Sequence, residues 1–87
     1  MAKKTIVENQ YQRVRKDIEE FEELIKNKKT VETVDKIVLD IAIMYKNDAK
    51  YYLEKKDYFT AWGCINYAFG LIDSELKFKR NSNSLND

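Results

Sequence analysis

The sequence predicts an all-α fold, an antiparallel up-down-up bundle of three helices. Apolar residues recur at alternating steps of three and four along three long segments of the 87-residue chain. Proline is absent and glycine occurs twice, so the residues that form β-turns are scarce. Short polar breaks separate the three segments, and short connections place consecutive helices antiparallel to each other.

The first helix is expected to begin at a capping box, in which Thr5 and Glu8 satisfy each other's backbone amides. An apolar stripe then runs along one face of this helix, and its members are Val7, Tyr11, Val14, Ile18, Phe21 and Ile25. Such a stripe must be covered by other apolar stripes, because the opposite face of the helix is polar.

Two further stripes predict the second and third helices. The second stripe consists of Val34, Ile37, Val38, Ile41, Met44, Tyr45 and Tyr52, and the third of Tyr58, Ala61, Ile65, Phe69, Ile72 and Leu76. Thr30 and Asp57 are expected to cap the N-termini of these helices. We therefore expect one domain over residues 1–80 and a disordered polar tail over residues 81–87.

Composition argues against an enzyme. Histidine is absent, which removes the commonest general base and the commonest transition-metal ligand. The single cysteine, Cys64, cannot form an internal disulfide or a Cys–His nucleophile. We therefore expect no catalytic residues, no metal and no cofactor.

Composition also bears on location. The 16 basic residues nearly balance the 15 acidic ones, so no overall field attracts nucleic acid or a membrane. The longest apolar runs fall far short of the roughly 20 residues that span a bilayer, and the N-terminus does not resemble a signal peptide. We expect no membrane association and a cytoplasmic location.

Residues 48–73 carry a resemblance to a known family. Its elements are Asp48-Ala49, Tyr52-Leu53-Glu54-Lys55, Asp57-Tyr58, Ala61, Tyr67-Ala68, Gly70 and Asp73. In order and spacing they resemble the signature of short archaeal proteins, domain-of-unknown-function family number 357. The resemblance implies a three-helix bundle and an archaeal cytoplasmic origin, and it implies no activity. The family tends to have a turn glycine at the position of Lys56, and small residues at Ser74-Glu75.

Three polar residues are candidates for burial. Asp48 falls within the second stripe, between Tyr45 and Tyr52, so it is expected on the core side of its helix. There its carboxylate would need a hydroxyl, a lysine or backbone amides as partners. Asn66 and Asp73 border the third stripe and would line one polar pocket with Asp48. The alternative interpretations of Asp48 are a catalytic acid and a magnesium ligand.

Basic and aromatic residues gather at the two ends of the predicted bundle. The basic end holds candidates for anion binding, namely Lys26, Lys28, Lys29, Lys77, Lys79 and Arg80. They form either a phosphate-binding patch or a set of lysines that complement helix dipoles. The aromatic cluster at the other end consists of Tyr51, Tyr52, Tyr58, Phe59 and Trp62. We expect its side chains to be buried, because aromatic side chains at helical spacing dominate small cores. The alternative is that the rings are exposed and form a stacking platform for single-stranded nucleic acid.

One face of the third helix is a candidate partner-binding strip. Gly63, Tyr67, Gly70 and Ser74 lie opposite Ile65 on this helix. Each glycine costs about 1 kcal/mol relative to alanine inside a helix, and two small residues let another backbone approach. Otherwise the glycines relieve crowding against the first helix.

We therefore expect a non-enzymatic interaction module that forms a homo-oligomer or docks a protein partner. The alternative is a weak nucleic-acid or phosphate binder that uses the basic end and the aromatic cluster.

Overall fold

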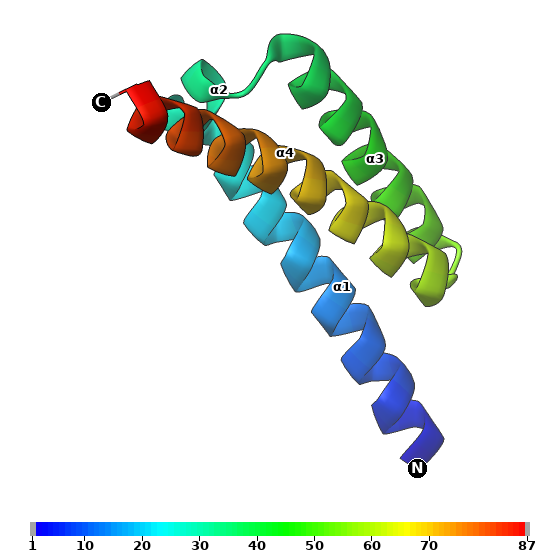
Figure 1. The fold of residues 1–87 in the computed structure, drawn as a ribbon. Coiled ribbons are helices and arrows are strands. Elements are labelled where there is room, and N and C mark those ends of the chain that lie inside the picture. Colours follow the sequence, from blue (N-terminus) through cyan, green and yellow to red (C-terminus); the bar gives the residue numbers. More distant parts are fainter. Residues whose placement is uncertain (1, 87) are drawn as a thin grey trace.

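The structure, a computed structural model, describes residues 2–86, with side chains described for 9–79, and helices are its only regular elements over this range. Figure 1 shows the four helices, which are α1 (Ala2–Lys26), α2 (Lys28–Thr33), α3 (Lys36–Glu54) and α4 (Tyr58–Asn86). The predicted all-α class is therefore confirmed, with four helices where the sequence predicted three. The capping box expected at Thr5 and Glu8 lies outside the described side chains.

The extra helix arises because the connection after α1 contains two capping residues. The side chain of Asn27 accepts a hydrogen bond from the amide of Thr30, 3.2 Å away, and starts α2. The side chain of Asp35 accepts one from the amide of Ile37 at 2.9 Å and starts α3. Thr30, which the sequence analysis took as the cap of the second helix, is instead a buried residue within α2.

Side-chain contacts fix the directions of the long helices. The ring of Tyr11 meets that of Tyr58 edge-on, with centroids 6.3 Å apart, and Phe21 meets Phe69 at 5.3 Å. Later residues of α1 therefore contact later residues of α4, so these two helices run in the same direction (Figure 1).

The helix between them runs the opposite way. The amide of Asp35, at the start of α3, donates a hydrogen bond to the carboxylate of Glu75 in the second half of α4. The helix α4 continues to Asn86, and the disordered tail proposed for residues 81–87 stays a prediction.

Four completely buried alanines line the contact between α3 and α4. We call this set the alanine seam, and its members are Ala42, Ala49, Ala61 and Ala68. Because alanine has only a methyl side chain, the two helices can approach each other closely. The contact between α3 and α4 is the most extensive helix contact in the structure. Ile65 and Ile72 of α4 are also fully buried and extend the core toward α1.

The first helix joins this hairpin through one apolar stripe and two cross-helix ion pairs that share Glu22. Val14, Ile18 and Phe21 are buried against the hairpin, as predicted. Glu22 accepts a hydrogen bond from the ammonium group of Lys50 at 3.0 Å, and the ammonium of Lys46 lies 3.6 Å away. The hydrogen bond from Lys50 lowers the pKa of the Glu22 carboxyl below its usual value. The other ion pairs among residues 9–79 join neighbours within one helix, so the two made by Glu22 are the interhelical ones.

A Schellman motif turns the chain between α3 and α4. The amide of Asp57 donates to the carbonyl of Tyr52 at 3.0 Å, and the amide of Lys56 donates to that of Leu53 at 3.1 Å. Lys56 has a φ of 65°, in the left-handed region that favours glycine. Asp57 then accepts a hydrogen bond from the amide of Thr60, which confirms the predicted cap of the last helix.

Replacing Lys56 with glycine should stabilise the protein. A left-handed non-glycine residue costs about 1 kcal/mol, which glycine avoids, so we expect Lys56→Gly to raise the free energy of unfolding by about that amount. Lys55 is right-handed, with φ −77°, so Lys55→Gly should instead lower it. Urea denaturation of both variants measures the difference, and equal destabilisation would contradict the turn geometry.

Candidate interaction surface

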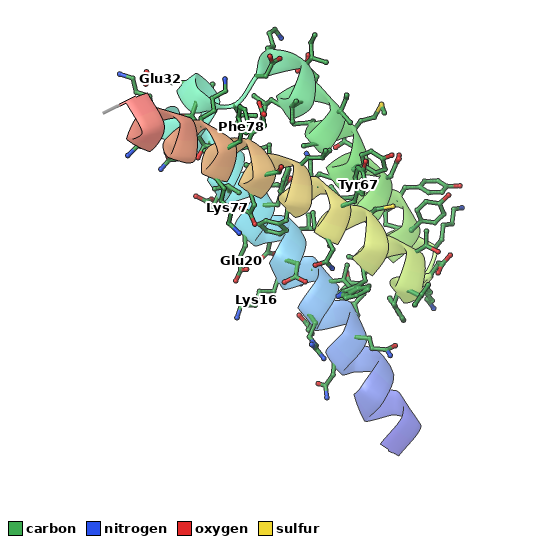
Figure 2. The ribbon with its side chains drawn as sticks, viewed as in Figure 1. Lys16, Glu20, Glu32, Tyr67, Lys77 and Phe78 are labelled. Atoms are coloured by element: carbon green, nitrogen blue, oxygen red, sulfur yellow. The ribbon has the colours of Figure 1, made fainter. Side chains whose placement is uncertain are left out.

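The α3–α4 hairpin exposes large apolar side chains on one face. We call this the hairpin face, and its exposed apolar members are Ile37, Ile41, Met44, Tyr51, Tyr67 and Phe78. Ile37 is 70% exposed, Met44 57% and Phe78 67%. Tyr67 and Phe78 are three helical turns apart on one side of α4, the side on which Tyr67 contacts α3 (Figure 2).

The exposure of this face corrects the predicted second stripe. The predicted burial is wrong for three of its residues, Ile37, Ile41 and Met44, which are exposed. The buried residues of α3 are Ala42 and Ala49, together with Leu53. Where two helices are in close contact, alanine fits between them and a longer side chain does not. The large residues therefore lie about a quarter of a turn or more away from the contact.

Asp48 is exposed, so its predicted burial is wrong. It does share a helix face with Ile41 and Tyr45, as expected, but this face points outward. Its carboxylate is therefore solvated and needs no structural partner.

Asn66 and Asp73 are also exposed, and the expected shared pocket does not form. The side-chain amide of Asn66 donates to the carbonyl of Trp62 at 2.8 Å, within α4 itself. Asp73 lines a groove between α4 and α1, whereas Asp48 lies on the hairpin face.

The four residues of the glycine strip, Gly63, Tyr67, Gly70 and Ser74, are all exposed. A Cβ atom added at either glycine would meet no atom within 4 Å. The glycines therefore relieve no crowding inside the chain, which removes the alternative explanation for them. The ring of Tyr67 tilts against that of Tyr45, with centroids 4.5 Å apart, so the strip borders the hairpin face.

The aromatic cluster at the α3–α4 turn is more exposed than expected. Phe59 is 83% exposed, Tyr51 55% and Trp62 50%, so the predicted burial is wrong for these three. Tyr52 and Tyr58 are half-buried. Phe59 and Trp62 help to line a groove of about 520 Å³ between α1 and the start of α4.

The lysines of the basic end divide into two groups. Lys26 and Lys28 lie 3.9 Å from Glu23 and Glu32 respectively, in ion pairs within their own helices. Three other lysines line one groove of about 830 Å³ and make no ion pair among residues 9–79; they are Lys29, Lys77 and Lys79. The side chain of Arg80 lies outside the described part.

This lysine-lined groove also contains carboxylates. Figure 2 shows Lys77 and Glu20 on the same side of the molecule, where α4 lies along α1. The groove is at the α2 end, and the aromatic cluster is at the α3–α4 turn, so the two expected binding features lie at opposite ends (Figure 1).

The described side chains give little reactive chemistry. Burial raises the pKa of the half-buried Cys64 thiol, and the nearby carboxylates of Asp48 and Asp57 raise it further, so the thiol stays protonated. Residues 9–79 hold no group of three side chains arranged to bind a metal ion. None of the helices in the described part of the chain has the length and apolar character needed to cross a membrane.

Comparison with known families shows to which family the chain belongs. A family model described as "Protein of unknown function (DUF357)" matches residues 9–79. The chain belongs to this family. The resemblance seen in residues 48–73 is thereby confirmed, and the match extends over parts of all four helices of this DUF357 protein. No curated protein and no solved structure matched the chain.

Substitutions at two neighbouring residues of α3 should differ sharply in their effect on stability. Asp48→Ala removes an exposed carboxylate, so the free energy of unfolding should change by less than about 0.5 kcal/mol. Ala49→Leu overfills the alanine seam and should lower it by about 1–3 kcal/mol. Urea denaturation compares them, and a loss of several kcal/mol in Asp48→Ala would show that this carboxylate is buried after all.

Proposed function

We propose that this DUF357 protein is a non-enzymatic interaction module that associates with a second copy of itself through the hairpin face. In this proposal α1, α3 and α4 form an up-down-up three-helix bundle that acts as the scaffold, and α2 belongs to the connection. The observation that carries the proposal is the exposure of six large apolar side chains on one side of the hairpin.

The size of this surface supports a stable contact. The exposed parts of the six side chains amount to on the order of 600 Å², at the upper limit for the largest apolar patch of a monomer. A standard interface uses about 800 Å² on each partner, which the flanking glycine strip and half-buried tyrosines would supply. Solvent exposure of so much apolar surface is costly, and a second helical surface would remove that cost.

The charge of the hairpin face supports a second copy as the partner. Asp48 gives it one negative charge, and Lys55 gives one positive charge at its end, 5.5 Å from the ring of Tyr51. A face with a strong charge of one sign would repel an identical copy, and this face has no such excess. Two-fold association places the same patch on both copies, so the apolar stripes would cover each other.

Charges placed on the hairpin face should prevent association. We expect the unmodified protein to form a reversible dimer in sedimentation velocity over a concentration series. Ile37→Glu with Met44→Glu should be monomeric and fully folded, because both side chains are already mostly exposed. The matched control, Asn9→Glu with Gln12→Glu, adds the same charge at exposed sites on α1, off this face, and should still dimerise. A monomer at every concentration, or a face variant that dimerises like the control, would refute the proposal.

The glycine strip is tested separately in the same assay. Gly63→Leu with Gly70→Leu should leave the fold intact, because both positions are exposed and a Cβ atom there contacts no other part of the chain. Loss of the dimer with an unchanged thermal melting curve would place the strip inside the interface. An unchanged dimer would restrict the interface to the apolar side chains.

Phosphate binding at the basic end is the second candidate function. The observation that favours it is a set of three lysines around one groove that make no ion pair among residues 9–79, namely Lys29, Lys77 and Lys79. Unpaired ammonium groups are available for phosphate oxygens, whereas Lys26 and Lys28 already have carboxylate partners.

Charge reversal tests this second candidate. We expect isothermal titration calorimetry to show weak binding of inorganic triphosphate at low salt, and Lys29→Glu with Lys77→Glu to abolish it. Lys16→Glu with Lys36→Glu changes the charge equally outside the groove and should retain binding. Absence of heat with the unmodified protein at low salt would remove phosphate binding as a function of this end.

A further inference from the structure

The groove at the α3–α4 turn combines aromatic and cationic side chains. We call it the turn groove, and its lining is Gln10, Arg13, Val14, Lys56, Asp57, Tyr58, Phe59 and Trp62. Its volume of about 520 Å³ is in the range of sites that bind small organic groups. It lies on the flank of α4 that faces α1, so it is separate from the hairpin face.

Two exposed aromatic side chains from one helix line this groove. Phe59 and Trp62 are three residues apart on α4, which makes them neighbours on the helix surface. Phe59 is 83% exposed and Trp62 is 50% exposed, so neither ring is buried in the protein core. Exposed aromatic faces at this spacing form a platform on which flat rings stack.

Two cations beside the rings lack partners. Arg13 and Lys56 make no ion pair among residues 9–79, where most other basic side chains do. Asp57, the acidic residue of the lining, accepts a hydrogen bond from the amide of Thr60 at 3.2 Å and keeps its negative charge. Two cations against this one carboxylate leave the lining with a net positive charge, and a guanidinium fork matches phosphate oxygens.

The backbone of Lys56 gives an independent indication. Lys56 is the non-glycine residue with positive φ in the described part of the chain. It occupies the position of a Schellman motif that is usually glycine. Strained backbone conformations concentrate at functional sites. A lysine held here at an energetic cost, on the rim of a groove with an unpaired arginine, indicates a use for its charge.

We propose that the turn groove binds a nucleotide unit of single-stranded nucleic acid, with its base stacked on Phe59 and Trp62 and its phosphate held by Arg13 and Lys56. A proline-rich peptide is the main rival for an aromatic-lined groove. Such a peptide stacks on rings but carries no phosphate, so it leaves the two free cations unexplained. This proposal is independent of self-association through the hairpin face.

The chain supplies its own probe for this site. Trp62 is the only tryptophan of the sequence, so a base that stacks on it should quench the tryptophan emission. The full chain is titrated at low salt with single-stranded oligouridylate, with AMP and with a proline-rich peptide. Quenching by oligouridylate and by AMP would show that a free nucleotide suffices. Quenching by oligouridylate alone would show that the site needs the strand.

Single substitutions locate the binding. Phe59→Ala should weaken oligouridylate binding about tenfold, since it removes one stacking partner. Lys56→Gly should reduce the salt dependence of the affinity by about 0.7 in the log–log slope, because one phosphate contact is lost. Both variants should fold, because Phe59 is exposed and glycine suits the turn. Lys36→Gln removes a charge far from the groove, at the start of α3, and should bind normally.

The results separate this proposal from the proposed self-association. The monomeric variant, Ile37→Glu with Met44→Glu, should keep the quenching, and Phe59→Ala should keep the dimer. No quenching by oligouridylate or AMP at low salt would overturn the proposal. Quenching that Phe59→Ala and Lys56→Gly leave unchanged, or quenching by the peptide alone, would overturn it as well.

Discussion

Four buried alanines hold α3 and α4 close together, and the arrangement of the larger side chains follows from this contact. Ala42 and Ala49 occupy the face of α3 that meets α4, so Ile37, Ile41 and Met44 are displaced to the outside. The core is instead completed by Phe21 of α1 and by Ile65 and Ile72 of α4. Tight helix packing and an exposed apolar face are therefore two results of one arrangement.

The last helix could be predicted from the sequence because its stripe contains large residues in the direction of the core. Ile65 and Ile72 identify that direction, and the glycine strip was correctly placed opposite. The second stripe failed because apolar size was taken as the sign of burial. Ala42 and Ala49 are seven residues apart and share a helix face, which was the available signal for the true contact.

Other parts of the site could not be predicted because they depend on tertiary geometry. The exposure of Phe59 and Trp62 depends on where α1 lies against the α3–α4 turn, and no local pattern gives this. The lysines of the basic end separated into a paired and an unpaired group among residues 9–79, although Lys29, Lys77 and Lys79 each have a carboxylate three or four residues away. Spacing along the helix therefore did not predict the pairing. The short helix α2 could have been recognised, because Asn27 and Asp35 are both favoured capping residues.

The attachment of α1 gives the molecule two levels of local stability. This helix meets the hairpin through a smaller contact than the one between α3 and α4, and Glu22 is its ion-pair anchor. Its first turns also run past the end of the hairpin (Figure 1). We expect opening events that release α1 to cost less free energy than global unfolding, so its amide protons should exchange with solvent sooner than those beside the alanine seam.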